Sequence, residues 1–142
     1  MLKGYDAGKK VSGIKRHILV DTQGLPHALH ISRANLTDRD GARMAIAHYQ
    51  EDLKGTTAIL ADGNYTGEDF AADVRQLVQA EVQIAKRSEL HTFKVIPKRW
   101  IVERSFAWLE KCRRLWKNCE RYLNTSLNMV VLAFIAISLR RL

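Results

Sequence analysis

The order of apolar and polar residues near the amino terminus predicts a β-hairpin followed by a helix. Residues 17–20 and 25–32 are two short apolar runs, and the turn sequence Asp21-Thr22-Gln23-Gly24 separates them. Residues 1–17 place three glycines among basic residues and are expected to form a basic loop. After the hairpin, helical spacing of apolar residues extends to residue 48, with Asp38 or Asp40 as the expected N-cap.

The middle of the chain predicts two strands with a helix between them. Residues 56–60 are small or apolar and are expected to form a buried strand that ends at Ala61-Asp62-Gly63. Residues 66–79 carry apolar side chains at helical spacing, and residues 82–85 form another short apolar run.

The last third of the chain predicts two helices. A long helix is expected from Pro97 to about residue 122, and its broad apolar face includes Trp108 and Trp116 as core residues. A second helix over residues 126–141 is apolar on most sides and is therefore expected to be mostly buried. The resulting order, ββαβαβαα, predicts an α/β domain with a mixed sheet and flanking helices.

The composition is that of an ordinary globular domain. The chain has 142 residues, of which 46% are hydrophobic and two are proline, which argues against disorder and fibrous repeats. Two cysteines are too few for a disulfide-rich secreted module. The apolar run at residues 129–139 is shorter than the ~20 residues that cross a bilayer, and no signal peptide is recognisable. We therefore expect a cytoplasmic protein with no membrane partner.

Charge is distributed unevenly along the chain, whose formal net charge is +8 at pH 7. Residues 1–17 carry five positive charges and one negative, residues 18–85 carry five and ten, and residues 86–122 carry eleven and four. Two basic segments that flank an acidic one suggest a polyanionic partner, most often nucleic acid. A basic surface that is merely solvated is the alternative.

Asp62 is the first candidate for chemistry, since it directly follows the strand predicted at residues 56–60. Ligands bind at the carboxyl ends of strands in open α/β sheets, and a carboxylate held there suits a hard cation such as Mg²⁺. The alternative is that Asp62 only caps the following loop or helix.

Glu103 is the second candidate. On the predicted long helix it lies in a narrow polar stripe, among basic residues and opposite the apolar face. The alternative is an exposed helix stabilised by ion pairs at i, i+3 and i, i+4. Trp100 lies at the edge of this stripe and, if half exposed, would suit stacking on a base. Cys112 and Cys119 lack a zinc-site pattern and are expected to be reduced and buried on one side of the helix.

Three blocks of sequence carry a resemblance to a known family. The first is Gly4-Tyr5-Asp6-Ala7-Gly8-Lys9-Lys10 with residues 15–24, the second is Ala61-Asp62-Gly63-Asn64-Tyr65, and the third is PKRWIVERSFAWL at residues 97–109. In this order and spacing, the blocks resemble the catalytic domain of bacterial insertion-sequence transposases of the DDE class. The similarity extends from about residue 4 to the carboxyl terminus.

The resemblance implies a ribonuclease H-like fold and a triad of two aspartates and one glutamate around two divalent ions, Mg²⁺ or alternatively Mn²⁺. Asp62 matches the second aspartate and Glu103 matches the glutamate, so both would be metal ligands. Arg99 matches the arginine that precedes the glutamate by four residues. Some relatives place a basic residue seven positions after the glutamate, where this chain has Glu110.

The first aspartate of that triad has no counterpart in the chain. In the family it lies on the first strand, upstream of the first block, whereas Asp6 belongs to that block and Asp21 to the hairpin turn. We therefore expect residues 1–142 to be the carboxyl-terminal part of a catalytic domain that lacks its first strand, as a gene remnant or a second reading frame. Two-metal phosphodiester chemistry would then be incomplete, and we expect the chain alone to be inactive.

The resemblance implies that the intact enzyme cleaves and joins DNA strands, with double-stranded DNA, both transposon ends and target, as its partner. The residues expected to contact the DNA backbone are Lys9, Lys10, Lys15, Arg16, Lys98, Arg104, Lys111, Arg113 and Arg114. Packing of the Arg104 stem against the apolar face is an equal alternative.

Further partners are implied by the incomplete triad and the expected DNA binding. One is a second copy of the chain, through self-association, and another is an upstream-frame product that completes the chain. When DNA is bound, we expect the protein to associate with the nucleoid. Two other functions stay open. One is a non-catalytic basic DNA-binding remnant, and the other is a small RNA- or ribosome-associated protein.

Overall fold

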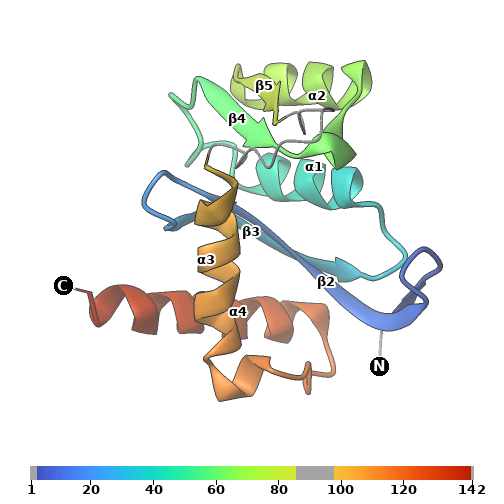
Figure 1. Ribbon diagram of the computed structural model, residues 1–142, viewed down its shortest axis with the longest axis vertical. Coiled ribbons are helices and arrows are strands. Elements are labelled where there is room, and N and C mark those ends of the chain that lie inside the picture. The colour runs from blue at the N-terminus through green and yellow to red at the C-terminus, as the bar shows by residue number, and fades with distance from the viewer. Residues whose placement is uncertain (1–2, 86–97, 142) are drawn as a thin grey trace, which may run out of the picture.

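The computed structural model describes residues 3–85 and 98–141, which form two sheets with helices packed around them (Figure 1). The first sheet is antiparallel in the order β1 (Gly4–Asp6), β2 (Val11–Val20) and β3 (Pro26–Arg33). The second sheet consists of two parallel strands, β4 (Ala58–Ala61) and β5 (Glu81–Ile84). The predicted α/β class is confirmed, but the described strands form two separate sheets and not one mixed sheet.

The helices in the described part of the chain follow the predicted order. The α-helices are α1 (Asp38–His48), α2 (Glu68–Val78), α3 (Arg99–Glu110) and α4 (Leu123–Leu139), and the short 3₁₀ helices are η1 (Gly63–Tyr65) and η2 (Arg113–Leu115). The N-cap of α1 is Thr37 and not Asp38 or Asp40, because the Thr37 Oγ1 accepts the N–H of Asp40 at 3.1 Å. A hydroxyl at this position satisfies a free amide of the first turn.

Strand β3 separates two hydrophobic cores, because its successive side chains point to opposite faces. Ala28 faces α1 and α2 and packs in a core with, among others, Ile46, Phe70 and Val74. Leu29 and Ile31 face α3 and α4 and pack in a second core with Leu109, Leu115, Val130 and Phe134. The hairpin of β2 and β3 therefore forms the middle layer of the molecule, with helices on both faces (Figure 1).

The predicted hairpin is confirmed, but the expected basic loop over residues 1–17 is wrong. The Asp21 carboxylate accepts the N–H groups of Gln23 at 2.8 Å and Leu25 at 3.0 Å, and Gly24 has a positive φ of 88°. These features close the turn that the sequence indicates. Upstream of it, β1 pairs with the first residues of β2, so a ladder of backbone hydrogen bonds orders a segment whose glycines favour a loop.

The long helix predicted up to residue 122 ends at Glu110, and its start at Pro97 lies outside the described residues. The guanidinium of Arg16 on β2 donates to the carbonyl oxygen of Leu115 at 2.7 Å. This contact holds the chain in η2, where Leu115 is buried while Trp116 is 77% exposed. The prediction of Trp116 as a core residue is therefore wrong, and Trp108 is only half-buried.

Two further elements are more exposed than predicted. Cys119 is exposed and Cys112 is half-buried, so the two thiols do not share one buried side of a helix. Helix α4 buries Ser126, Val130 and Phe134, but its opposite face is open, and the large apolar side chains exposed there are Leu132, Ile135 and Leu139. Only one face of α4 packs on the sheet, so the prediction of a mostly buried helix is wrong.

The strand predicted to be buried at residues 56–60 corresponds to β4, and its burial is also predicted wrongly. Ala58 is exposed and the side chain of Leu60 is 45% exposed. In the described part of the chain, β4 pairs with β5 along one edge, and no strand pairs with its other edge. The apolar sequence of β4 therefore lacks the cover that a central strand would have.

Candidate functional site

Asp62 lies at the carboxyl end of β4, where the strand passes into η1. Its Oδ1 accepts the N–H of Asn64 at 2.9 Å, so the side chain caps η1. The residue is half-buried. The capping role that competes with metal binding is therefore present, and it involves one oxygen of the carboxylate.

A second carboxylate, that of Asp38, acts together with Asp62 on the side chain of Tyr65. Burial raises the pKa of Tyr65 to about 12, and the charges of Asp38 and Asp62 add to the rise. Both carboxylates therefore act on the Tyr65 hydroxyl. In the sequence Asp38 is only a capping candidate, because its effect on Tyr65 arises where η1 packs on α1 and leaves no local signal.

Glu103 lies one turn into α3, on the exposed side of the helix. The Nε of Arg99 donates to its Oε1 at 2.8 Å, with the Arg99 side chain 42% and the Glu103 side chain 59% exposed. The i, i+4 ion pair that competes with a catalytic role is therefore present. An exposed pair of this kind stabilises a helix by only about 0.3–0.5 kcal/mol. The ion pair with Arg99 therefore adds little to the stability of the fold, and its main effect is to orient the Glu103 carboxylate.

Helix α3 is fastened to the turn of the β2–β3 hairpin at two successive residues. The guanidinium of Arg104 donates to the carbonyl oxygen of Gln23 at 2.7 Å, and the hydroxyl of Ser105 donates to that of Gly24 at 2.7 Å. The Ser105 side chain is fully buried. Glu103 immediately precedes these two anchors, so the hairpin turn sets the position of its backbone.

Two tryptophans hold the Arg104 guanidinium on α3. Its central carbon lies 4.7 Å from the ring centre of Trp100 and 5.0 Å from that of Trp108. Trp100 is 50% exposed, as expected from its place at the edge of the polar stripe. Arg141, at the end of α4, covers Trp108 with its guanidinium carbon 3.5 Å from the ring centre. The sequence did not indicate this contact, because Trp108 lies on α3 and Arg141 just beyond the end of α4.

The carboxylates of Asp62 and Glu103 come from separate parts of the fold. In Figure 1 the first turn of α3 is the end of that helix nearest the sheet of β4 and β5. Within residues 3–85 and 98–141, no group of three or more His, Cys, Asp or Glu side chains is placed to hold a metal ion. A site for two divalent ions needs several carboxylate ligands. The described residues do not by themselves fit such a site.

Besides Arg104, two more of the basic residues expected to contact DNA are engaged within the protein. The Nζ of Lys15 lies 3.2 Å from carboxylate oxygens of both Asp6 and Asp38 and donates to the carbonyl oxygen of Leu36 at 2.8 Å. Burial tends to lower the pKa of Lys15, but these two carboxylates outweigh burial and raise it. For Arg16, which binds the Leu115 carbonyl, burial lowers the pKa despite the opposing charge of Glu110.

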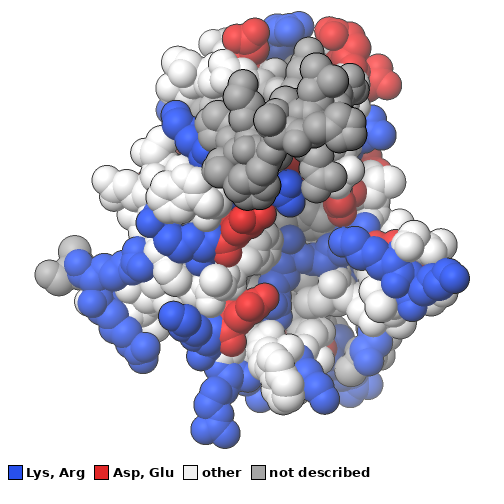
Figure 2. Space-filling model, in the orientation of Figure 1, with Lys and Arg blue, Asp and Glu red and all other residues white. Residues whose placement is uncertain are grey.

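The other basic residues expected to contact DNA, apart from Arg104, are exposed on the surface. They are Lys9, Lys10, Lys98, Lys111, Arg113 and Arg114. Arg114 forms an ion pair with Glu120 at 2.6 Å. Figure 2 shows Lys and Arg side chains gathered over the lower part of the visible face, around α3, the β1–β2 hairpin and the carboxyl end, whereas red side chains are prominent at the top. One region of the surface is therefore strongly basic.

Comparison with known proteins assigns these features to a family. Residues 1–139 match the family model described as the transposase DDE domain. The chain belongs to this family. A Burkholderia cepacia protein named "Putative transposase for insertion sequence element IS402" is 32% identical over 116 residues, which cover 77% of this chain and 54% of that protein. The chain thus spans about half the length of this relative, and no solved structure matches it.

Family membership confirms the resemblance carried by the three sequence blocks. Proteins of the DDE transposase family generally use divalent metal ions and act on DNA. Among the helices of the described residues, none combines the length and the apolar character needed to span a bilayer.

Proposed function

We propose that this chain is part of an insertion-sequence transposase and that it binds double-stranded DNA. The whole protein would cleave the strands of this DNA and join them. The family match over residues 1–139 is the observation that carries the proposal. The positions of Asp62 at the carboxyl end of β4 and of Glu103 on the exposed side of α3 agree with it. In this proposal Asp62 and Glu103 are metal-ligand candidates, and Arg99 orients Glu103.

The two separate sheets support a ribonuclease H-like fold in which one further strand lies between β2 and β4. Among the described residues, β4 pairs only with β5, and residues 14–20 of β2 pair only with β3. An unpaired edge leaves backbone donors and acceptors unsatisfied, and the side chain of Leu60 stays 45% exposed. A strand in this position would satisfy both edges and cover the apolar side chains of β4.

The same strand is the proposed source of a third carboxylate, because the described residues hold no complete metal-binding group. We expect the chain alone to bind DNA without cleaving it. A non-catalytic DNA-binding remnant is the alternative function, and it makes the same prediction for DNA binding.

The exposed cations are the proposed phosphate contacts. Lys9, Lys10, Lys98, Lys111 and Arg113 are exposed, whereas Lys15, Arg16, Arg104 and Arg114 already bind oxygen atoms of the protein itself. Contacts of this kind position a protein on the DNA backbone without reading its sequence. Each phosphate neutralised contributes about −0.9 to the slope of log K against log salt concentration, so five contacts give a slope of about −4 to −5.

A salt titration of binding to duplex DNA tests the DNA-binding part of the proposal. We expect a slope near that value for duplexes of unrelated sequence. Binding that is insensitive to salt would contradict the proposal. Tighter binding to structured RNA than to duplex DNA at equal ionic strength would favour the RNA-associated alternative.

A nicking assay with Mg²⁺ or Mn²⁺ tests the incomplete metal centre. We expect little or no cleavage of supercoiled DNA by the chain alone. Asp62→Asn is the matched control, because an asparagine oxygen still accepts the Asn64 N–H and preserves the cap. Robust cleavage that disappears in Asp62→Asn would show that no third carboxylate is needed, and the proposed extra strand would lose its catalytic role.

A further inference from the structure

Trp116 is the most exposed of the large apolar and aromatic side chains in the described part of the chain, at 77%. It lies in the α3–α4 connection, residues 111–122, which includes η2 and forms the lower end of the molecule in Figure 1. Tyr122, the last residue of this connection, is 60% exposed. Aromatic rings gain much from burial, so two rings left in water within one short segment indicate a binding surface.

The α3–α4 connection is also strongly basic. It carries five Lys or Arg residues and one glutamate, and Figure 2 shows Lys and Arg side chains gathered at this end of the visible face. The Nζ of Lys117 lies 5.3 Å from the ring centre of Trp116, and the guanidinium carbon of Arg121 lies 6.0 Å from that of Tyr122. Aromatic rings interleaved with cations favour a polyanion as the partner of this surface.

Contacts within the protein hold the backbone on both sides of Trp116. The guanidinium of Arg16 donates to the carbonyl oxygen of Leu115 at 2.7 Å, and the Leu115 side chain is buried. After Trp116, the side-chain oxygen of Asn118 accepts the hydroxyl of Ser126 on α4. The Trp116 ring is therefore presented to solvent from a fixed backbone, which reduces the entropy that is lost when a ligand binds.

A basic groove of about 540 Å³ lies beside Trp116. Lys117 lines the groove and approaches the Trp116 ring, which places the ring at the edge of the groove. Lys3 and Arg16 also line it, and the one carboxylate among its described lining residues is that of Glu110. Lys3 and Lys117 are exposed. A basic groove with an aromatic ring at its edge is typical of surfaces that follow the backbone of a single nucleic-acid strand while a base stacks on the ring.

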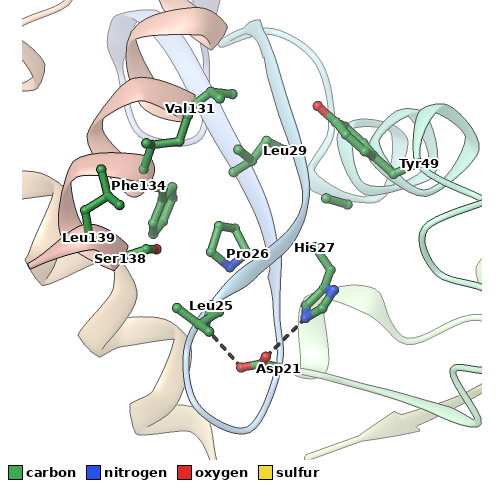
Figure 3. Close-up of a pocket in the computed structure, with 12 residues that line it drawn as sticks. Asp21, Leu25, Pro26, His27, Leu29, Tyr49, Val131, Phe134, Ser138 and Leu139 are labelled. Carbon is green, nitrogen blue, oxygen red and sulfur yellow. Dashed lines mark hydrogen bonds and ion pairs between the residues drawn. The ribbon is translucent and has the colours of Figure 1, made fainter. Parts of the chain in front are cut away.

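A second groove of about 540 Å³, beside β3, has the opposite character (Figure 3). None of the twelve described residues that line it is Lys or Arg, and Asp21 contributes a carboxylate. Most of the side chains labelled in Figure 3 are apolar. This groove offers phosphate groups no cation, so the groove beside Trp116 suits nucleic acid better.

The exposed ring of Trp116 fits an unpaired strand better than a duplex. Bases within a duplex stack on one another and present only their edges in the grooves. Away from the ends of a duplex, a base has a free face only where its strand is unpaired, and such a face stacks on an aromatic ring whatever the base. We propose that the groove beside Trp116 binds one unpaired DNA strand, with Lys3 and Lys117 at the phosphates and a base stacked on Trp116. The inference rests on the proposed DNA-binding function and adds the form of DNA that this site takes.

Fluorescence anisotropy at one ionic strength tests the site, with a labelled oligothymidylate of about 12 nucleotides as the single strand and a long duplex for comparison. Trp116→Leu should raise the dissociation constant for the oligothymidylate at least about fivefold, because it removes the stacking surface but keeps an apolar side chain. The same variant should change the dissociation constant for the duplex by less than about twofold. The conservative variant Trp116→Phe should restore most of the affinity for the single strand, since phenylalanine also has an aromatic face.

Two further measurements support the comparison. Met44→Ala is the matched control, since Met44 is an exposed apolar residue of α1 that does not line the groove, and it should leave both affinities unchanged. Binding of the oligothymidylate should quench tryptophan fluorescence, and the quenching should be smaller in Trp116→Phe. Circular dichroism verifies that each variant is folded.

Three results would overturn the proposed single-strand site. They are an unchanged affinity of Trp116→Leu for the oligothymidylate, equal losses for single strand and duplex, and equal losses in Trp116→Leu and Trp116→Phe. Tighter binding of an oligouridylate than of the oligothymidylate would overturn its assignment to DNA. Salt-dependent duplex binding without any effect of Trp116 on the single strand would refute this site alone, whereas a chain that binds neither form of DNA would refute the proposed function as well.

Discussion

Gly41 and His17 lie in direct contact where α1 crosses β2, and a Cβ atom on Gly41 would lie 2.1 Å from Cε1 of the imidazole. The ring cannot move aside easily, because His17 is buried and its Nε2 lies 2.8 Å from the Oγ of Ser32. A glycine within a helix usually costs stability, and here it permits close packing of the helix on the strand.

We therefore predict that Gly41→Ala destabilises the fold by about 1–3 kcal/mol, since overpacking outweighs the better helix propensity of alanine. Urea denaturation measures this change. Gly13→Ala is the control, because nothing lies within 4 Å of a Cβ built on Gly13. Equal stability of Gly41→Ala and the unmodified chain would show that α1 can move away from the strand.

Stability should fall as the pH drops below about 6.5. Burial lowers the pKa of His17 from 6.5 to about 4, with a smaller effect from His30, whose own pKa is also lowered by burial. A histidine whose pKa is lower in the folded state stabilises the fold above its unfolded pKa, and this stabilisation is lost as the pH falls toward 4. For His17 the loss reaches about 3 kcal/mol. Urea midpoints measured at pH 7.5, 6 and 5 should decrease in that order, and a flat profile would contradict the burial of a neutral imidazole.

Arg104 should affect the stability of the fold, whereas Lys9 and Lys10, in the turn between β1 and β2, should affect the salt dependence of DNA binding. Arg104→Ala removes the bond to Gln23 and the contacts with Trp100 and Trp108, so it should lower the melting temperature. It should leave the salt dependence of DNA binding unchanged. A smaller salt slope at an unchanged melting temperature would instead make Arg104 a phosphate contact.

The converse is expected of the exposed lysines. Replacement of Lys9 and Lys10 by alanine should leave the melting temperature unchanged, because both side chains are exposed and no hydrogen bond or ion pair of either side chain is described. The slope of log K against log salt should become less steep by about 1 for each lysine. Fluorescence anisotropy with a labelled duplex measures both variants under the same conditions.

Glu103→Gln should leave stability within about 0.5 kcal/mol of the unmodified chain, because the ion pair with Arg99 is exposed to solvent. Thermal unfolding followed by circular dichroism measures this. A much larger loss would assign Glu103 a structural role and weaken its candidacy as a metal ligand.

The sequence predicted well those parts of the fold that depend on local patterns. The β2–β3 hairpin follows from its turn residues, and α2 and β5 follow from apolar periodicity within a few residues. The end of α3 could not be predicted in this way, since the apolar pattern continues past Glu110. A contact between Arg16 and Leu115, 99 residues apart in the chain, holds η2 against β2.

The candidate site shows the same division. The ion pair of Arg99 with Glu103 and the cap formed by Asp62 are local and were among the interpretations that the sequence offered. The ion pairs of Lys15 with Asp6 and Asp38 join three segments of the chain, and neither charge nor spacing along the sequence indicates them. Basic residues that the sequence pattern does not distinguish therefore divide into those that hold the fold together and those that face solvent.

The anchoring of α3 on residues 23 and 24 has a consequence for how this protein can vary. Surface turns ordinarily accept insertions and deletions with little effect. Here the turn between β2 and β3 is a fixed-length spacer, because Gln23 and Gly24 bind the two residues that follow Glu103. A single residue inserted there would shift the glutamate along with the helix. We expect natural variation in length to be excluded from this turn and accommodated in other surface loops.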